Sequence, residues 1–178
     1  MLVAQPEGES MTKSEFMGMV ETIQSATGKL ISLVPEGQRT WRPYPGAASF
    51  GELMAQMVCD CETVHSFFMN TLTEWNFDPN SLDDDPKSMP TSEAIAAWEI
   101  DRGKMLTFLG SLSEREFHEK VLQAPWGQTA KAEILLHIFF LQRKACWNAN
   151  LYLYLKMIGI PVDEGTLYYG ANPGTMAD

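Results

Sequence analysis

The sequence is poor in the residues that build disulfide frameworks and common metal sites. Its 178 residues include three cysteines and three histidines. These are Cys59, Cys61, Cys146, His65, His118 and His137. An odd, small number of cysteines gives no disulfide framework, which favours a reducing compartment such as the cytoplasm. No two histidines stand four residues apart, so the chain has no H-x-x-x-H motif.

Basic residues and long apolar runs are also scarce. The 13 Lys and Arg residues against 23 Asp and Glu residues give a formal net charge of -10. The basic residues are scattered, whereas a surface for nucleic acid or anionic membranes needs them clustered. No stretch reaches the ~18 apolar residues of a transmembrane helix, and the N-terminus lacks the basic and apolar regions of a signal peptide. We therefore expect a soluble cytoplasmic protein that binds neither nucleic acid nor membrane.

The sequence does contain long stretches of helical periodicity. Apolar residues recur at helical intervals in four segments. The predicted helices cover 13–33, 49–72, 91–112 and 129–158. A short helix, capped by Ser113 and Glu116, is predicted between the last two. No strand pattern of any length appears, and long connections follow the first and second helices.

These patterns predict an all-α protein, a four-helix bundle with long connections after helices 1 and 2. We expect three parts along the chain. Residues 1–11 form a disordered N-terminal segment, and residues 12–162 form the bundle. Residues 163–178 form a tail, read as a loop, that packs on the bundle or extends from it.

Three segments resemble the DinB/YfiT-like family. LVPEGQRTWRPYPGAASFGELMAQMV is similar to that family's junction of helices 1 and 2, APWGQTAKAEILLH to the start of its last helix, and NLYLYLKMIGIPV to the end of that helix. The resemblance covers roughly Thr12 to Val162. It implies a DinB-like four-helix bundle, often a homodimer, that holds nickel or zinc through one His of helix 2 and two of the last helix. The implied activities are thiol S-transfer, maleylpyruvate isomerisation and metal-dependent hydrolysis.

The sequence departs from the family at the metal-ligand positions. Gln56 stands where helix 2 usually carries a His. If the last helix is aligned from its C-terminal end, its two ligand positions fall on Arg143 and Trp147. Aligning on His137 instead puts a leucine and an alanine in those places. Neither register recovers a pair of ligands, so we expect no metal cofactor.

Helical geometry favours the first register. At ~100° per residue, one stripe of the last helix contains Arg143 and Trp147 together with apolar residues. The stripe consists of Leu136, Phe140, Arg143, Trp147, Asn150, Tyr154 and Ile158. We therefore predict that Arg143 and Trp147 point into the bundle, with His137 at the edge of the stripe.

Two interpretations of Arg143 are open. A buried guanidinium needs acceptors, because an unpaired buried charge is very costly. In the first interpretation Gln56, with Asp60 or Glu62, holds Arg143 in the place of the missing metal, and Trp147 fills the remaining volume. In the second, Arg143 extends to solvent at the bundle end and buries only its stem.

Two functions follow from these residues. We favour a protein with a degenerate metal site that binds a small anionic molecule through Arg143, in a pocket at Gln56, Arg143 and Trp147. Asp60, Glu62 and His137 are supporting candidates. The alternative is a metal-dependent thiol S-transferase or hydrolase-like enzyme with rearranged ligands.

Overall fold

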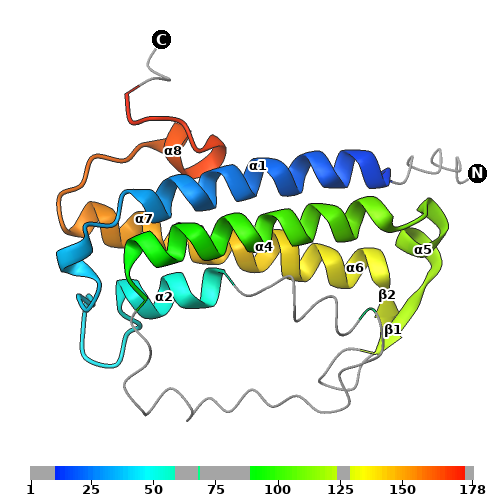
Figure 1. Ribbon diagram of the computed structural model, residues 1–178, viewed down its shortest axis with the longest axis horizontal. Coiled ribbons are helices and arrows are strands. Elements are labelled where there is room, and N and C mark those ends of the chain that lie inside the picture. The colour runs from blue at the N-terminus through cyan, green and yellow to red at the C-terminus, as the bar shows by residue number, and fades with distance from the viewer. Residues whose placement is uncertain (1–10, 59–67, 69–88, 124–128, 175–178) are drawn as a thin grey trace, which may run out of the picture.

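The computed structural model describes residues 11–58, 68, 89–123 and 129–174. Over these ranges the chain is mainly helical, with one small antiparallel sheet, so the all-α class is confirmed there (Figure 1). Within the same ranges, no helix has the length and apolar character needed to cross a membrane. Several predictions fall outside the described residues. They concern residues 1–10, Cys59, Asp60, Cys61, Glu62 and His65.

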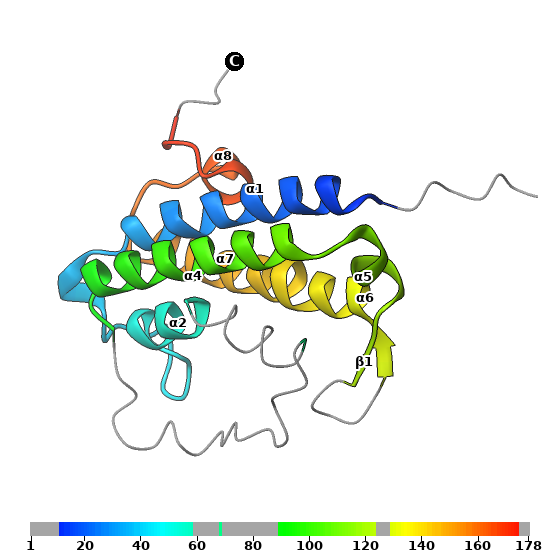
Figure 2. The same ribbon diagram turned by 45° about the vertical axis from the view of Figure 1, so that its right-hand side comes forward.

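The helices α1 (Lys13–Ser32) and α4 (Thr91–Ser111) lie side by side in both Figure 1 and Figure 2. A capping box starts α1, in which Glu15 N donates to Thr12 Oγ1 and Thr12 N donates to Glu15 Oε2 at 2.8 Å. This reciprocal pair satisfies two of the backbone donors that every helix start leaves open. Both helices match the predicted ranges within one residue.

Shorter elements connect and flank the long helices. They are η1 (Glu36–Gln38), α2 (Phe50–Met57) and α5 (Glu114–Glu119). Capping boxes also start α2, from Ser49 to Glu52, and α5, from Ser113 to Glu116, which confirms both predicted starts. Of predicted helix 2, the structure describes α2 and, farther along the chain, the buried residue Phe68.

A small hairpin occupies a region where the sequence shows no strand pattern. The strands β1 (Val121–Gln123) and β2 (Thr129–Lys131) pair antiparallel. Each strand has only three residues, too few for alternating burial to stand out from the sequence. The last helix consequently begins at Ala132 rather than at Thr129.

The last helix is continuous, but it contains a π-helical turn. It consists of α6 (Ala132–His137), the π turn η2 (Ile138–Arg143) and α7 (Lys144–Met157). A π turn bonds residue i to i+5 instead of i+4, so it takes in one extra residue. Every side chain after the turn is rotated by about one position, or ~100°, around the helix axis.

This rotation changes which residues are buried. The buried residues of α7 are Lys144, Asn148, Leu151 and Leu155. Within the turn, Phe140 is buried as predicted, but Arg143, and Trp147 after the turn, are only half-buried, and Asn150 is exposed. Beyond Phe140 the fully buried residues are thus not those of the predicted stripe, which assumed an unbroken α-helix. Trp147, Tyr154 and Ile158 of the stripe nevertheless pack, half-buried, against the core around Leu151 and Leu155.

The tail forms a helix rather than a loop. In α8 (Glu164–Tyr169) the N-cap Asp163 accepts from Thr166 N at 2.8 Å through Oδ1 and from Gly174 N at 2.6 Å through Oδ2. The helix ends at Gly170, whose φ is 67° and whose Cβ position would lie 2.6 Å from Ser25 O. Only glycine fits there, so α8 packs closely on α1, as Figure 1 shows.

The apolar core is divided into two clusters along the long helices. One cluster lies toward α5 and α6, and the other toward α2 and the end of α7. The first includes Phe16, Val20, Met105, Phe108, Leu109, Phe117 and Phe140. The second includes Leu30, Ile31, Phe50, Met54, Met57, Leu151 and Leu155. The part of the core between them is polar.

Gly28 provides the first test of this packing. A Cβ on Gly28 would lie 2.5 Å from Cζ2 of the Trp98 ring, so α1 and α4 approach each other only because Gly28 has no side chain. We expect Gly28→Ala to lower the free energy of unfolding by about 2 kcal/mol in urea denaturation, since overpacking forces the ring to move. In the control Gly103→Ala, no neighbour lies near the new methyl group, and the helix gains up to ~1 kcal/mol. Equal effects of the two substitutions would contradict the close approach.

Candidate functional site: a buried polar layer beside an open groove

A layer of buried polar side chains separates the two apolar clusters. It contains Gln24 and Thr27 from α1, Asp101 from α4, and Lys144 and Asn148 from α7, each 4% exposed or less. Burying such groups is costly unless they form hydrogen bonds. The layer therefore aligns three helices at one level.

Thr27 and Asn148 join α1 to α7. Thr27 Oγ1 donates to Asn148 Oδ1 at 2.9 Å, and Asn148 Nδ2 donates to Ile23 O at 3.3 Å. The amide nitrogen of Asn148 carries two N–H groups, and Ile23 takes one of them. Asn148 is thus a firmly held side chain with a further donor.

Gln24 joins α1 to α4 at the same level. Trp98 Nε1 donates to Gln24 Oε1 at 3.0 Å, and Gln24 Nε2 donates to the thioether sulfur of Met105 at 3.5 Å. The hydrogen bond from Trp98 to Gln24 fixes the plane of the Trp98 indole ring, whose edge lies over Gly28. The polar layer and the close helix approach therefore support each other.

Lys144 is the most unusual member of the layer, because a fully buried lysine is rare. Its Nζ donates to Met57 O at the end of α2 and lies 5.8 Å from the centre of the Trp147 ring. The carbonyl end of a helix carries partial negative charge, which suits an amine. The sequence pattern did not indicate Lys144 or Asn148 as site residues. The signal that could have found them is their spacing. Lys144, Asn148 and Leu151 recur at helical intervals on one side of the helix after the π turn.

The predicted residues Gln56, Arg143 and Trp147 lie beside the layer rather than in it. All three are half-buried. Gln56 belongs to α2 and Trp147 to α7, which pack against each other, and Arg143 is the last residue of the π turn. The guanidinium carbon of Arg143 lies 4.5 Å from the centre of the Trp147 ring and 5.3 Å from that of Phe139. Stacking on aromatic faces stabilises a guanidinium. The predicted partners Asp60 and Glu62 lie outside the described residues.

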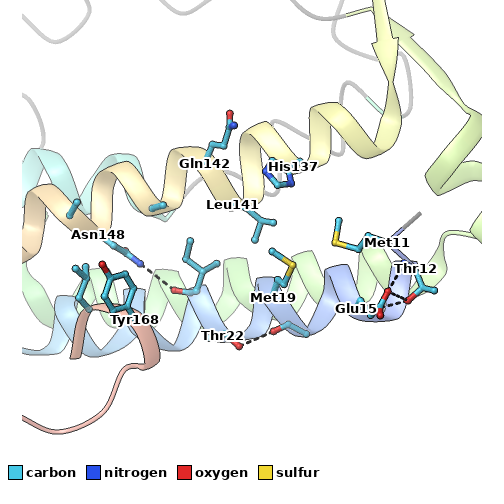
Figure 3. A pocket seen from close by; sticks show the side chains of 15 residues that line it. Met11, Thr12, Glu15, Met19, Thr22, His137, Leu141, Gln142, Asn148 and Tyr168 are labelled. Carbon is cyan, nitrogen blue, oxygen red and sulfur yellow. Dashed lines mark hydrogen bonds between the residues drawn. The ribbon is translucent and has the colours of Figure 1, made fainter. Parts of the chain in front are cut away.

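A groove that does not include Gln56, Arg143 or Trp147 runs along α1, between α1, the π turn, α7 and α8 (Figure 3). Its volume is about 1500 Å³. Apolar side chains form much of its wall, among them Met19, Ile23 and Leu141, and α8 adds Leu167 and Tyr168 at one end. The groove reaches the polar layer at Asn148, which is part of its lining.

On the last helix, residues spaced four apart face the groove. His137 lines it, and so do Leu141 and Ala145, the two positions of the alternative register of the last helix. Arg143 and Trp147 do not line it, although the sequence predicts them as pocket residues. Of the predicted supporting residues, His137 is the one that the structure describes, and it lies beside this cavity.

The described residues contain no group of three His, Cys, Asp or Glu side chains arranged to hold a metal ion. Two carboxylates do lie around His118 of α5. Its Nδ1 lies 2.7 Å from Glu133 Oε2, and its Nε2 lies 3.3 Å from Glu114 Oε2. The two carboxylates occupy opposite sides of the imidazole, so they do not converge on one point.

No family model matches this chain, and no curated protein matches it either. The resemblance to the DinB/YfiT-like family therefore depends on the three segments quoted above.

Lys144→Met tests the polar layer, because methionine keeps the length of the stem and removes the amine. We expect the free energy of unfolding to fall by about 1–3 kcal/mol, since the Met57 carbonyl loses a donor inside the protein. The control Lys104→Met, at an exposed position of α4, should change stability by no more than ~0.5 kcal/mol in the same urea titration. A Lys144→Met protein as stable as its control would show that the amine contributes nothing to the layer.

Asp163 predicts a pH dependence at the end of the groove. Hydrogen bonds from Gly174 N and from Thr166 lower the pKa of Asp163 below its ordinary 3.8. A lowered folded-state pKa means that the stabilisation is complete above the unfolded-state value and is lost as the pH falls through the folded-state value. We expect the amide NMR signals of Thr166 and Gly174 to report loosening of α8 in that range.

The matched variant for this titration is Asp163→Asn. Asparagine keeps an N-cap acceptor but has no charge to titrate. Its α8 signals should not change over the acidic range in which those of the unsubstituted protein do. The same acid transition in both proteins would assign the loosening to another group.

Proposed function

We propose that this protein is a DinB-like helical bundle that binds a small, mainly apolar molecule in the groove between α1 and α7, without the metal chemistry of that family. The observation that supports this most is the groove itself. Ligand sites are typically concave and mainly apolar, with a few placed polar groups, and this groove has that composition.

The groove is built on elements that are already held in place. Thr27 and Asn148 bridge α1 and α7 beneath it, and the Asp163 cap and the Gly170 approach hold α8 at one end. A site with fixed walls loses little conformational entropy when a ligand binds. The arrangement therefore favours binding to the preformed groove over folding around a ligand.

The groove supports a different location for the ligand than the one predicted from Arg143. The Arg143 guanidinium lies over Trp147 and Phe139, and Arg143 is not part of the groove lining. We therefore propose an apolar ligand in the groove, in place of the anion at Arg143 that the sequence predicts.

The test is a titration with an environment-sensitive apolar dye, comparing two alanine-to-tryptophan variants. Ala145 lines the groove, and a tryptophan there should fill it and weaken dye binding at least tenfold. Ala96, exposed on α4 and outside the groove, is the control, and Ala96→Trp should bind as the unsubstituted protein does. Equal binding by both variants would place the dye elsewhere and contradict the proposal.

Two other outcomes have separate readouts. Near-stoichiometric nickel, zinc, iron or manganese in elemental analysis of the untagged protein would favour the metal-dependent transferase or hydrolase. The family resemblance also implies a homodimer, and the other outcome is that the groove is covered by a second copy of the chain. In that case Ala145→Trp would change the mass measured by light scattering, with no dye binding to either form.

A further inference from the structure

The charges around the groove are unevenly distributed. Glu15 is the one Asp, Glu, Lys or Arg side chain among the described residues that line it. The remaining polar lining consists of hydroxyl, amide and imidazole groups, such as those of Thr22, Gln142 and His137. A ligand with a carboxylate or phosphate would therefore find no Lys or Arg partner in the described lining.

Glu15 is held in a defined position by the start of α1. Thr12 donates to Glu15 Oε2 through its backbone N at 2.8 Å and through Oγ1 at 2.9 Å (Figure 3). Oε1 takes part in neither bond, so it keeps its lone pairs for another donor. The bonds from Thr12 lower the pKa of the Glu15 carboxyl, which keeps it ionised at neutral pH.

The apolar part of the groove extends away from this carboxylate. Glu15 and Ile23 are eight residues apart on α1, which corresponds to ~12 Å along the helix axis. Met19 lies between them, and Leu167 and Tyr168 of α8 lie at the far end. Methionine side chains adapt readily to apolar chains of different shape. The groove thus has an anionic end and an apolar length suited to a chain.

The charge of the whole protein acts in the same direction. A formal net charge of -10 attracts cations and repels anions over distances comparable to the molecule at low salt. The local carboxylate and the overall field therefore favour the same kind of ligand.

We propose that the groove selects a cationic amphiphile, an alkyl amine whose ammonium group lies at Glu15 and whose chain extends toward α8. This assignment rests on the proposed function of the groove and specifies the class of its ligand. The ammonium donates to Glu15 Oε1, and the chain buries apolar surface against the groove wall.

The experiment displaces the bound dye with three probes that share one chain length: decylamine, decanol and decanoic acid. It is done at low salt, where the charge pair at Glu15 is screened least. We expect decylamine to bind most tightly and decanoic acid least tightly. The advantage of decylamine over decanol should shrink at high salt, because exposed charge pairs are screened.

Glu15→Gln is the matched variant, since glutamine can also complete a capping box and the start of α1 is preserved. It should weaken decylamine binding about threefold to fivefold, as expected for an exposed charge pair, and leave decanol binding unchanged. Glu21→Gln removes the same charge from an exposed position of α1 outside the groove, and it should affect neither probe comparably.

The outcomes separate the two proposals. If decanol binds and Ala145→Trp blocks it, but decylamine has no advantage or Glu15→Gln behaves like Glu21→Gln, the cationic assignment is overturned and the groove remains a binding site. If decanoic acid binds most tightly, the assignment is likewise wrong. If no probe displaces the dye from the groove, both proposals fail together.

Discussion

Five almost fully buried polar side chains in the middle of a helical protein constrain the packing around them. Gln24, Thr27, Asp101, Lys144 and Asn148 lie at one level of three helices, between two apolar clusters. Apolar contacts alone would allow these helices to slide or rotate, since hydrophobic burial is not directional. Each hydrogen bond across the layer is specific to one alignment. The layer thus determines how α1, α4 and α7 are positioned relative to one another.

The π turn is what makes this alignment compatible with the rest of the last helix. Within the turn, the buried face carries Phe140 and its apolar neighbours. After it, the same face carries Lys144 and Asn148, which meet the end of α2 and the side of α1. Without the extra residue, Arg143 and Trp147 would occupy these positions. The turn therefore places a lysine and an asparagine in the layer and leaves Arg143 stacked on aromatic rings beside it.

The groove and the layer are two consequences of one arrangement. The residues that face α1 beyond the turn include the small Ala145 and Ala149, and α8 covers only part of the seam between α1 and α7. Asn148 belongs to both the layer and the groove lining, so the groove rests on a hydrogen-bonded base. The capping box that begins α1 also sets the position of Glu15. The hydrogen bonds that cap the start of α1 thereby position the one carboxylate that lines the groove among the described residues.

The sequence by itself determined the helical class, the three capping boxes and the limits of α1 and α4. These features depend on residues close together in the chain, whose hydrogen bonds and periodicity are visible in one dimension. It did not determine the strands, which are only three residues long, or α8, whose glycine-containing turns of helix are too short for a clear period.

Only the tertiary structure decided the phase of the last helix and, with it, which residues form the candidate site. A π turn has no local signature strong enough to be read here, because its cost is offset by contacts with other helices. One inserted residue rotates all later side chains by about 100°, so Lys144 and Asn148, rather than Arg143 and Trp147, are the fully buried residues of this face. The groove is likewise a property of packing, since its walls come from α1, the last helix and α8, which meet only in the folded protein.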